Sequence, residues 1–302
     1  MRHLRCMINF SKFKTIKMKS FVFCTCYANA GIRYLHPERY SKWIKYNGQI
    51  LDELGAGHIF LIDDGSERKD IGNIAGVDAF YRAEELPDEC HGKVNMVSFD
   101  SHLGRKAVDD YQGWWRNFTY SIDLAEKYQF DKIIHIESDF FILSDRLKEY
   151  IKNLQQGWTA LYSSTFACPE SAVQVICKDN FPWLRKILDR ARKNNYQFNR
   201  NAELILPFTH VNKNFTGDRI GEIEAFVRWA REIKNCSEFD FIGQISPEIK
   251  ALSSEKLHGL LSAFNERSIA ADEKDMDILF SLLREHDLME TVTTNNLVGS
   301  EA

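Results

Sequence analysis

A strong excess of basic residues is missing from this sequence. Its 302 residues contain 39 Lys and Arg against 43 Asp and Glu, which gives a formal net charge of −4. Domains whose main task is to grip a phosphate backbone usually carry a clear basic excess, because every phosphate adds a negative charge. We therefore expect no nucleic acid among the partners of this chain.

The cysteines follow no disulfide or metal-binding pattern. There are seven, an odd number at scattered spacings, as is typical of a protein from a reducing compartment. Cys24 and Cys26 alternate along an expected strand and would face the same side, but two further zinc ligands at a suitable spacing do not follow. The sequence predicts a cytoplasmic protein without a structural zinc site.

Long apolar runs are absent from the first twenty residues, and the chain has no internal repeat or low-complexity segment. The start is basic instead, which predicts neither a transmembrane anchor nor a secretory signal. Two interpretations stay open. Residues 1–18 are either a lead-in without a task of its own, or a patch peripheral to the inner face of an anionic membrane, where each cation adds only ~1 kcal/mol.

What the chain does have is an ordinary globular composition, 44% hydrophobic and 27% charged. Apolar, β-rich runs predict strands at residues 21–26, 58–62, 94–99, 132–136 and 159–163. Helical spacing of apolar residues predicts helices at 37–54, 113–128, 147–154, 182–194, 221–233, 255–264 and 272–286. Strands alternating with helices are typical of a parallel sheet, so we predict an α/β fold with a Rossmann-like, mainly parallel central sheet flanked by helices.

The predicted domain organisation follows from the same pattern. The catalytic domain is expected over residues 19–245, a C-terminal helical extension over 246–288 and a disordered tail over 289–302. The basic helix at 182–194 and the C-terminal helices are compatible with acceptor binding, membrane contact or a homodimer.

An acidic turn, Asp63-Asp64-Gly65-Ser66, follows the second expected strand. Ligands of open α/β sheets bind outside the carboxyl ends of the strands. A carboxylate at this place can accept a hydrogen bond from the N3–H of uracil or from a ribose hydroxyl. The plain alternative is a simple turn, because Asp-Gly is among the commonest turn dipeptides.

A second acidic segment, Glu137-Ser138-Asp139, follows the apolar strand at 132–136. Two carboxylates at one strand end are able to hold Mn²⁺ or Mg²⁺ and bridge the ion to a diphosphate. Such an ion acts as a Lewis acid on the departing nucleoside diphosphate. The alternative here is an acidic strand cap exposed to solvent.

These two segments, with Phe21-Val-Phe-Cys-Thr-Cys-Tyr and Gly113-Trp-Trp-Arg-Asn, resemble the GT-A-fold glycosyltransferases, most closely the family 2 branch, over roughly residues 20–165. The resemblance implies a metal-dependent hexosyltransferase. It would move a sugar from a nucleotide diphosphate donor, preferably UDP-linked, to a hydroxyl of a saccharide or lipid-linked glycan, as in surface polysaccharide synthesis. It also implies that Asp63 or Asp64 contacts the base and that Asp139 binds the metal.

The remaining predicted site residues belong to the same segments. Glu137 is the second candidate metal ligand, but it occupies the position where the family has Asp. The alternative for its longer side chain is a contact with ribose or water. Residues 99–111 are longer and more basic than in the family, so their cations either meet the diphosphate or form a solvated loop. The complete donor-binding prediction is Thr25, Tyr27, Asp63, Asp64, Arg105, Lys106, Arg116, Glu137 and Ser138.

The catalytic base is expected in the second half of the chain. An inverting transferase needs a carboxylate that removes the proton of the acceptor hydroxyl. Glu222 is the first candidate and Asp218 the second, because both lie at an expected loop-to-helix junction. Acids in the first turn of a helix are also favoured simply by the helix dipole. A similarity of the segment around Asp139 to family 8 retaining enzymes leaves the stereochemistry open.

Two other functions compete with glycosyl transfer. A nucleotidyltransferase also uses a Rossmann-like sheet and a metal, but it normally carries a Gly-rich, basic loop after the first strand, which residues 27–31 do not supply. A catalytically silent domain that binds a nucleotide sugar would keep the fold without the chemistry. Glu137 in place of Asp keeps that hypothesis open.

Overall fold

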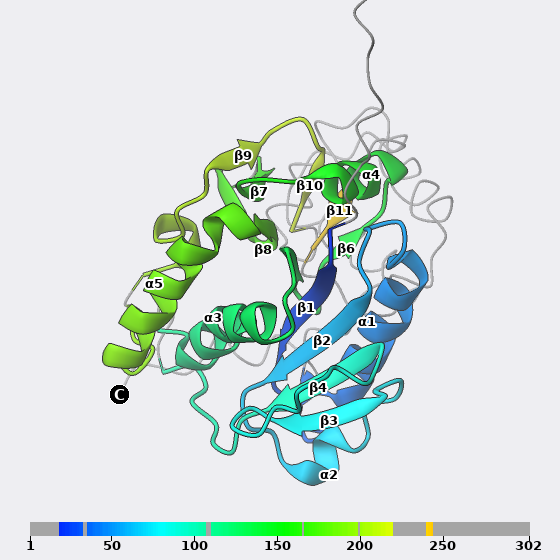
Figure 1. Cartoon of the computed structure of the whole chain (residues 1–302), viewed down its shortest axis with the longest axis vertical. Helices are drawn as coiled ribbons and strands as arrows, with labels where there is room; N and C mark the ends of the chain where they lie inside the picture. The colour runs from blue at the N-terminus through cyan, green and yellow to red at the C-terminus, as the bar shows by residue number, and fades with distance from the viewer. Residues whose placement is uncertain are drawn as a thin grey trace, which may run out of the picture.

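The computed structural model describes residues 18–32, 35–106, 110–164, 166–198, 200–219 and 240–243. The strands of its main sheet are β1 (Ser20–Cys26), β2 (His58–Asp63), β3 (Ala79–Arg82), β4 (Val94–Ser98), β5 (Lys132–Ile136), β7 (Trp158–Ser163), β8 (Cys168–Cys177) and β9 (His210–Asn212). They lie in the order β3-β4-β2-β1-β5-β8-β7-β9. Neighbours are parallel except where β8 pairs with β5 and with β7. The predicted α/β fold with a mainly parallel sheet is confirmed (Figure 1).

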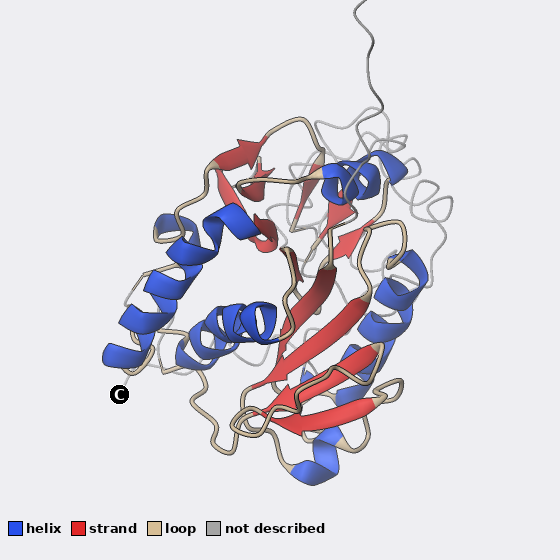
Figure 2. Ribbon diagram, in the orientation of Figure 1, coloured by secondary structure: helices blue, strands red, loops and turns tan. Residues whose placement is uncertain are grey.

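Helices cover both faces of this sheet (Figure 2). They are α1 (Pro37–Ile50), α2 (Arg68–Ile71), α3 (Gln112–Lys127), α4 (Asp145–Asn153) and α5 (Phe181–Lys193), with short 3₁₀ turns at Lys178–Asn180 and Ala202–Leu204. One apolar cluster joins α1 and α4 to the sheet, and a second joins α3 and α5 to it. Strand β1 serves both: Val22 and Cys24 belong to the first cluster, and Phe21 and Phe23 to the second. The period of two along a strand explains this division.

A small second sheet follows the acidic segment at 137–139. It consists of β6 (Phe141–Ile142), β11 (Phe241–Ile242) and β10 (Gly217–Asp218), in the order β10-β11-β6. Asp240, which is fully buried, anchors this small sheet. Its carboxylate accepts a hydrogen bond from Thr216 N (2.7 Å) and forms an ion pair with Arg146. A single strand, β11, therefore separates the chain just after Asp139 from the chain around residue 217.

The expected elements compare closely with the observed ones. All five expected strands occur, and the four helices expected within the first 200 residues end within a few residues of their predicted bounds. Strands β3, β6, β8, β9, β10 and β11 and the short helix α2 were not predicted. Residues 1–17 and 246–302 lie outside the described residues, and so do the expected helices at 221–233, 255–264 and 272–286. Across the described ranges, none of the helices combines the length and the apolar composition that a membrane span requires.

Lys132 of β5 is a buried cation that joins the sheet to the end of α4. Only 1% of the residue is exposed, and its Nζ donates to the carbonyl oxygens of Ile151 (2.9 Å), Lys152 (2.9 Å) and Leu154 (3.2 Å). The last carbonyls of a helix have no partner within the helix, and the negative end of its dipole favours a cation. Lys132, a residue of β5, thus caps the C-terminal end of α4.

Lys132→Met is expected to lower the free energy of unfolding by about 2 kcal/mol, because methionine fills the volume but leaves the three carbonyls without their donor. Urea denaturation followed by circular dichroism measures this change. Lys45→Met, at an exposed position of α1, is the control and should stay within about 0.5 kcal/mol of the wild type. Equal stability of the two variants would contradict the capping role.

Candidate functional site

The sheet has a topological switch point between β1 and β5. The chain leaves β1 through α1 to β2 on one side, and later reaches β5, on the other side of β1, through α3 on the opposite face. Open α/β sheets leave a crevice for ligands at the carboxyl ends of such strands. Because β2, β1 and β5 are parallel neighbours, the acids after Ile62 and after Ile136 lie along one edge, as predicted.

Glu137 is held at this crevice by three other side chains. Thr25 Oγ1 lies 3.0 and 2.9 Å from its two carboxylate oxygens, Trp114 Nε1 donates to Oε1, and His135 Nε2 lies 3.1 Å from Oε1. Burial acts to raise the pKa of Glu137, but the charge and hydrogen bond of His135, with those of Trp114 and Thr25, outweigh it and hold the pKa below its ordinary value. Glu137 is an internal anion that ties β1, α3 and β5 together.

His135 is a site residue that the sequence analysis missed. It is fully buried in β5, with Nδ1 3.1 Å from the carbonyl oxygen of Ser171 and Nε2 directed at Glu137. It therefore orients the Glu137 carboxylate. The signal was a histidine inside the apolar run 132–136, since a buried polar group requires a partner.

Asp139 is the carboxylate that stays accessible at the edge. Its side chain is 28% exposed, and its Oδ2 lies 3.2 Å from Arg39 Nη2. Arg39 also donates from Nε to Ser138 Oγ (2.9 Å). Burial acts to lower the pKa of Arg39, but Asp139 and other nearby anions raise it overall. An anion and a cation thus stand together at the switch point.

Arg39 was also missed, although its position carries a local signal. It lies in the first turn of α1, just after Pro37 and Glu38. The positive end of the helix dipole disfavours a cation there. Such a conflict is expected where a residue serves a partner outside its own helix, and Asp139 is that partner.

The described part of the switch point offers a divalent metal Asp139 but not Glu137. Among the residues that the structure describes, no group of three His, Cys, Asp or Glu side chains is placed to hold an ion. Glu137 does not fit as a ligand, because its oxygens already accept hydrogen bonds from Thr25, Trp114 and His135. Asp139 does fit, since Mg²⁺ is often held by one or two carboxylates together with substrate phosphates.

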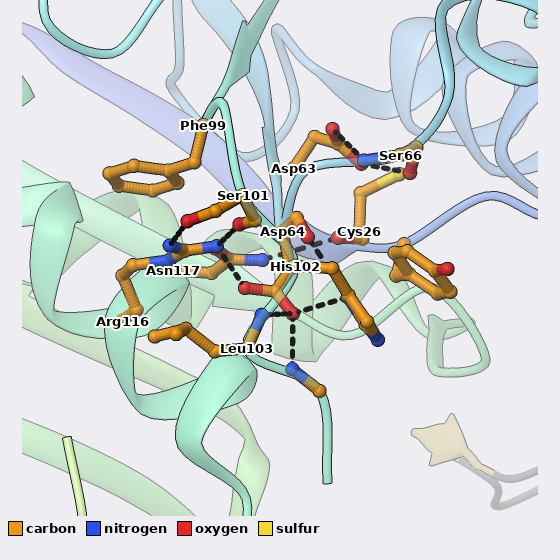
Figure 3. A network of polar contacts seen from close by, with 12 residues as sticks. Cys26, Asp63, Asp64, Ser66, Phe99, Ser101, His102, Leu103, Arg116 and Asn117 are labelled. Atoms are coloured by element: carbon orange, nitrogen blue, oxygen red, sulfur yellow. Dashed lines mark hydrogen bonds and ion pairs between the residues drawn. The ribbon is translucent and has the colours of Figure 1, made fainter. Parts of the chain in front are cut away.

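Asp63 closes the turn after β2 (Figure 3). It is fully buried and accepts hydrogen bonds from Ser66 N (2.9 Å), Ser66 Oγ and Ser98 Oγ (2.6 Å). Burial raises its pKa, and the bonds from Ser66 and Ser98 oppose that rise. Both carboxylate oxygens of Asp63 thus have partners within the chain. This agrees better with a simple turn than with a carboxylate that is free to bind a nucleotide base.

Asp64 holds the loop at residues 101–104 (Figure 3). Its side chain forms an ion pair with Arg116, lies 2.8 Å from His102 Nδ1 and accepts from Leu103 N (3.2 Å) and Gly104 N (2.8 Å). Only 4% of the Asp64 side chain and 6% of the Arg116 side chain are exposed. Predicted as donor-binding residues, the two instead engage each other and this loop.

Gly65 permits the close approach of the two loops. Its φ of +75° is one that other residues rarely adopt, and a Cβ at this position would lie 2.4 Å from the carbonyl carbon of Ser101. The glycine of the acidic turn is therefore needed for both its conformation and its size.

An aromatic pair stands at the rim of the site. The rings of Tyr27 and His102 stack with centroids 3.7 Å apart and planes 21° apart, and the His102 side chain is 41% exposed. Tyr40 Oη fixes the backbone of Tyr27 by accepting from its N–H (3.1 Å) and donating to its carbonyl (2.8 Å). The loop held by Asp64 thereby meets the end of β1.

The other predicted cations lie farther along the same loop. Arg105 and Lys106 are exposed, and the Arg105 guanidinium lies 4.4 Å from the centre of the Tyr111 ring. Of the nine predicted donor-binding residues, the structure brings four to the switch point, places four in or against the 101–106 loop, and places Asp63 in the turn after β2. The first group is Thr25, Tyr27, Glu137 and Ser138, beside the predicted metal ligand Asp139, and the second is Asp64, Arg105, Lys106 and Arg116.

The two base candidates differ in what the structure describes of them. Glu222 lies outside the described residues. The backbone of Asp218 belongs to β10, where it pairs with Ile242, which in turn pairs with Phe141. Two strand spacings are about 10 Å, so the backbone of Asp218 lies near the segment that begins just after Asp139.

A buried ion-pair cluster that was not predicted anchors the chain beside Asp218. Arg219 donates to Glu170 (2.8 and 3.2 Å) and to Glu203 (3.0 Å), and Glu170 is fully buried. Burial raises the pKa of Glu170, while Arg219 opposes that rise. Because Glu170 precedes Ala172, whose carbonyl accepts from Glu137 N (2.9 Å), the cluster joins β10 to the switch point.

A hollow of about 360 Å³ lies elsewhere, beside the outer strand β3. Three of its charged side chains are paired, Asp123 with Arg192 and Lys127 with Asp88. The hollow lies beside the outermost strand of the sheet rather than at the switch point, where open α/β sheets bind ligands, and we place the candidate site at the switch point for that reason. The residues that line the hollow are Ala83, Glu84, Leu86, Tyr120, Asp123, Lys127 and Arg192.

The chain is similar to several solved structures at low sequence identity. No family model and no curated protein matches the chain. A glycosyltransferase involved in glycosylation of the major capsid of PBCV-1 is similar over 81% of this chain and 99% of its own, with 8% identity and a TM-score of 0.42. HddC from Yersinia pseudotuberculosis is similar over 70% of this chain and 97% of its own, with 13% identity and a TM-score of 0.35.

A putative protein from Aquifex aeolicus VF5 is similar over 59% of this chain and 78% of its own, with 12% identity and a TM-score of 0.33. Likenesses at this level carry no conclusion about function. The α/β fold rests on the strand order of the chain itself, and the function is inferred from the site.

Proposed function

We propose that the crevice at the carboxyl ends of β1 and β5 binds a nucleotide diphosphate sugar, and that the chain transfers its sugar to a hydroxyl. The observation that supports this most is the meeting of Asp139 and Arg39 at the topological switch point of the sheet. The resemblance of the sequence to GT-A glycosyltransferases favours a UDP-linked donor and a saccharide or lipid-linked glycan as acceptor.

The proposed donor site has two regions, one for the nucleotide base and one for the diphosphate. The base would lie against the Tyr27–His102 pair, whose exposed ring offers a stacking surface. Asp63 and Asp64 support that surface, because Asp63 fixes the turn after β2 and Asp64 fixes the 101–104 loop. We propose this supporting role for them ahead of a direct contact with the nucleotide base. The diphosphate would lie toward Asp139, with Arg39 beside it and Arg105 and Lys106 on the rim.

Asp139 is the residue we propose to hold Mn²⁺ or Mg²⁺ together with the donor phosphates. A bound ion would supply Lewis-acid neutralisation of the charge on the leaving nucleoside diphosphate. Arg39, which now pairs with Asp139, is a second positive charge of the chain at the same place. Thr25, Trp114 and His135 keep Glu137 turned inward, so that Asp139 rather than Glu137 faces the donor.

For the base we propose Asp218 ahead of Glu222, which reverses the order given by the sequence. The reason is that the backbone of Asp218 lies in the small sheet that starts just after Asp139. In an inverting transfer the base takes the proton of the acceptor hydroxyl while that oxygen bonds to the anomeric carbon. The bond from that carbon to the diphosphate oxygen breaks, and the diphosphate leaves with its electrons.

The test of the function is release of UDP from a panel of UDP-sugars with Mn²⁺ present. We expect slow hydrolysis without acceptor, with UDP as the product. A nucleotidyltransferase would instead release no UDP from these donors, and would form UTP and a sugar 1-phosphate from them when pyrophosphate is added. If a donor binds but no UDP is released from it, the result would support a catalytically silent binding domain. This is the second candidate, because Asp139 is already paired with Arg39.

Asp218→Asn is expected to lower sugar transfer to an acceptor by about 100-fold while donor affinity stays within a few-fold, because a general base contributes 10²–10⁴ to the rate. Glu222→Gln is the matched variant, in which a carboxylate also becomes an amide. Transfer assays by mass spectrometry and donor binding by calorimetry measure the two effects. If only Glu222→Gln loses transfer, the original order of the candidates is correct.

A further inference from the structure

Helix α5 carries a row of exposed side chains on the side that faces away from the core. We call Trp183, Lys186, Arg190 and Lys193 the outer stripe; all four are exposed, Trp183 to 52%. Residues spaced three and four apart lie on one face of an α-helix. The buried residues of the helix lie on the other side and are Phe181, Leu184, Leu188 and Ala191.

The basic residues of α5 fall into two groups. Arg185 and Arg192 form ion pairs with Asp123 of α3 (2.7 and 2.6 Å), and Arg185 also pairs with Glu126 (2.5 Å). These contacts fix α5 along α3, and the two helices lie side by side (Figure 1). Within the part of the chain that the structure describes, the three cations of the outer stripe form no ion pair.

The spacing of apolar residues in 182–194 predicts that Trp183 faces the core with Leu184 and Leu188, and this prediction is wrong. Trp183 lies outside, with Lys186 Nζ 4.3 Å from its ring centre. Because the Trp183 indole is exposed, it contributes little to the stability of the protein through burial. The same combination suits a membrane–water interface, where the amphipathic indole lies at the headgroup level and lysine stems cover apolar surface.

The stripe also has a defined place relative to the switch point. Gln112 Nε2 donates to the carbonyl of Asn195 (2.9 Å), which joins the chain just after α5 to the start of α3. The start of α3 follows the loop at 101–106, and Gly113 N donates to Gly104 O (2.9 Å). The Lys193 end of the stripe is therefore directed toward the rim of the proposed donor site.

We propose that the outer stripe of α5 binds the surface of an anionic phospholipid bilayer. Three outward cations complement anionic headgroups, and Trp183 supplies the interfacial side chain. A symmetric dimer through this stripe would oppose like charges, because a two-fold interface uses the same patch on both copies. If the proposed function also holds, the arrangement brings the donor site close to the bilayer and favours a lipid-linked acceptor.

The test is co-sedimentation of the full chain with vesicles of phosphatidylcholine alone or mixed with phosphatidylglycerol. We expect binding to the mixed vesicles only, weakened by salt. The variant Lys186→Glu/Arg190→Glu/Lys193→Glu should bind about 100-fold more weakly. The matched control Lys45→Glu/Arg68→Glu/Lys93→Glu makes the same change of net charge at exposed positions elsewhere, and should lose less than threefold.

Quenching by brominated lipids tests the role of Trp183 separately. We expect quenching of the wild type and clearly less quenching of Trp183→Phe, because Trp183 is 52% exposed whereas Trp43, Trp115 and Trp158 are fully buried. The proposal is overturned if the wild type does not bind the mixed vesicles, if the stripe variant binds as the control does, or if the stripe variant changes the oligomeric state instead. None of these results depends on UDP release, so this proposal and the proposed function fail independently.

Discussion

Asp139→Asn is expected to lower UDP release from the donor by about 100- to 1,000-fold. The substitution keeps the size of the side chain and removes its charge, so residue 139 can no longer help to hold an ion against the diphosphate. Losses of this size are usual when one group that stabilises developing charge is removed. Initial rates at saturating donor and Mn²⁺ measure the effect.

Asp145→Asn is the matched control, since its side chain is 96% exposed and lies in the first turn of α4, close in sequence to Asp139. Its rate should stay within about twofold of the wild type, as for a surface substitution remote from the site. Equal unfolding free energies of the wild type and Asp139→Asn would assign the loss to the site. If Asp139→Asn releases UDP at the same rate as the control, Asp139 has no role in the reaction.

Arg116→Met is expected to lower the free energy of unfolding by about 3–5 kcal/mol, the usual effect of breaking a buried ion pair. The substitution leaves Asp64, whose side chain is 4% exposed, without its cation. It also removes two donors to Ser101 and the guanidinium that lies 4.2 Å from the ring of Phe99. Urea denaturation measures the change, and Arg68→Met at an exposed position of α2 is the control.

A double variant makes this prediction sharper. Asp64→Asn/Arg116→Met should be more stable than Arg116→Met alone, because removing both partners no longer leaves an isolated buried charge. If the double variant is as unstable as the sum of the two single variants, the pair does not interact in the way the geometry indicates.

The sequence predicted the strands that have simple apolar patterns and missed those that do not. The run at residues 132–136 is entirely buried, as its composition indicates. Strand β8 was missed because Glu170, Ser171 and Gln174 are buried polar residues inside it, each with a partner from elsewhere in the fold. Strand β3 was missed because it is short and half exposed, with little pattern to detect.

The sequence also predicted the edge on which the site lies, but not the use of each side chain there. Asp63 and Asp64 follow a strand end as expected, yet their partners come from loops and helices far along the chain. Such pairing depends on tertiary contacts, which a single sequence does not specify. Arg39 and His135 are exceptions, because a cation in a first helical turn and a histidine in an apolar strand both conflict with their local setting.

A crystal structure of the chain with UDP and Mn²⁺ tests the central claim most directly. We predict that the diphosphate lies against Asp139 at the carboxyl ends of β1 and β5, with the uracil beside Tyr27 and His102. A nucleotide bound in the hollow beside β3, or Asp139 still paired with Arg39 and remote from the diphosphate, would contradict it.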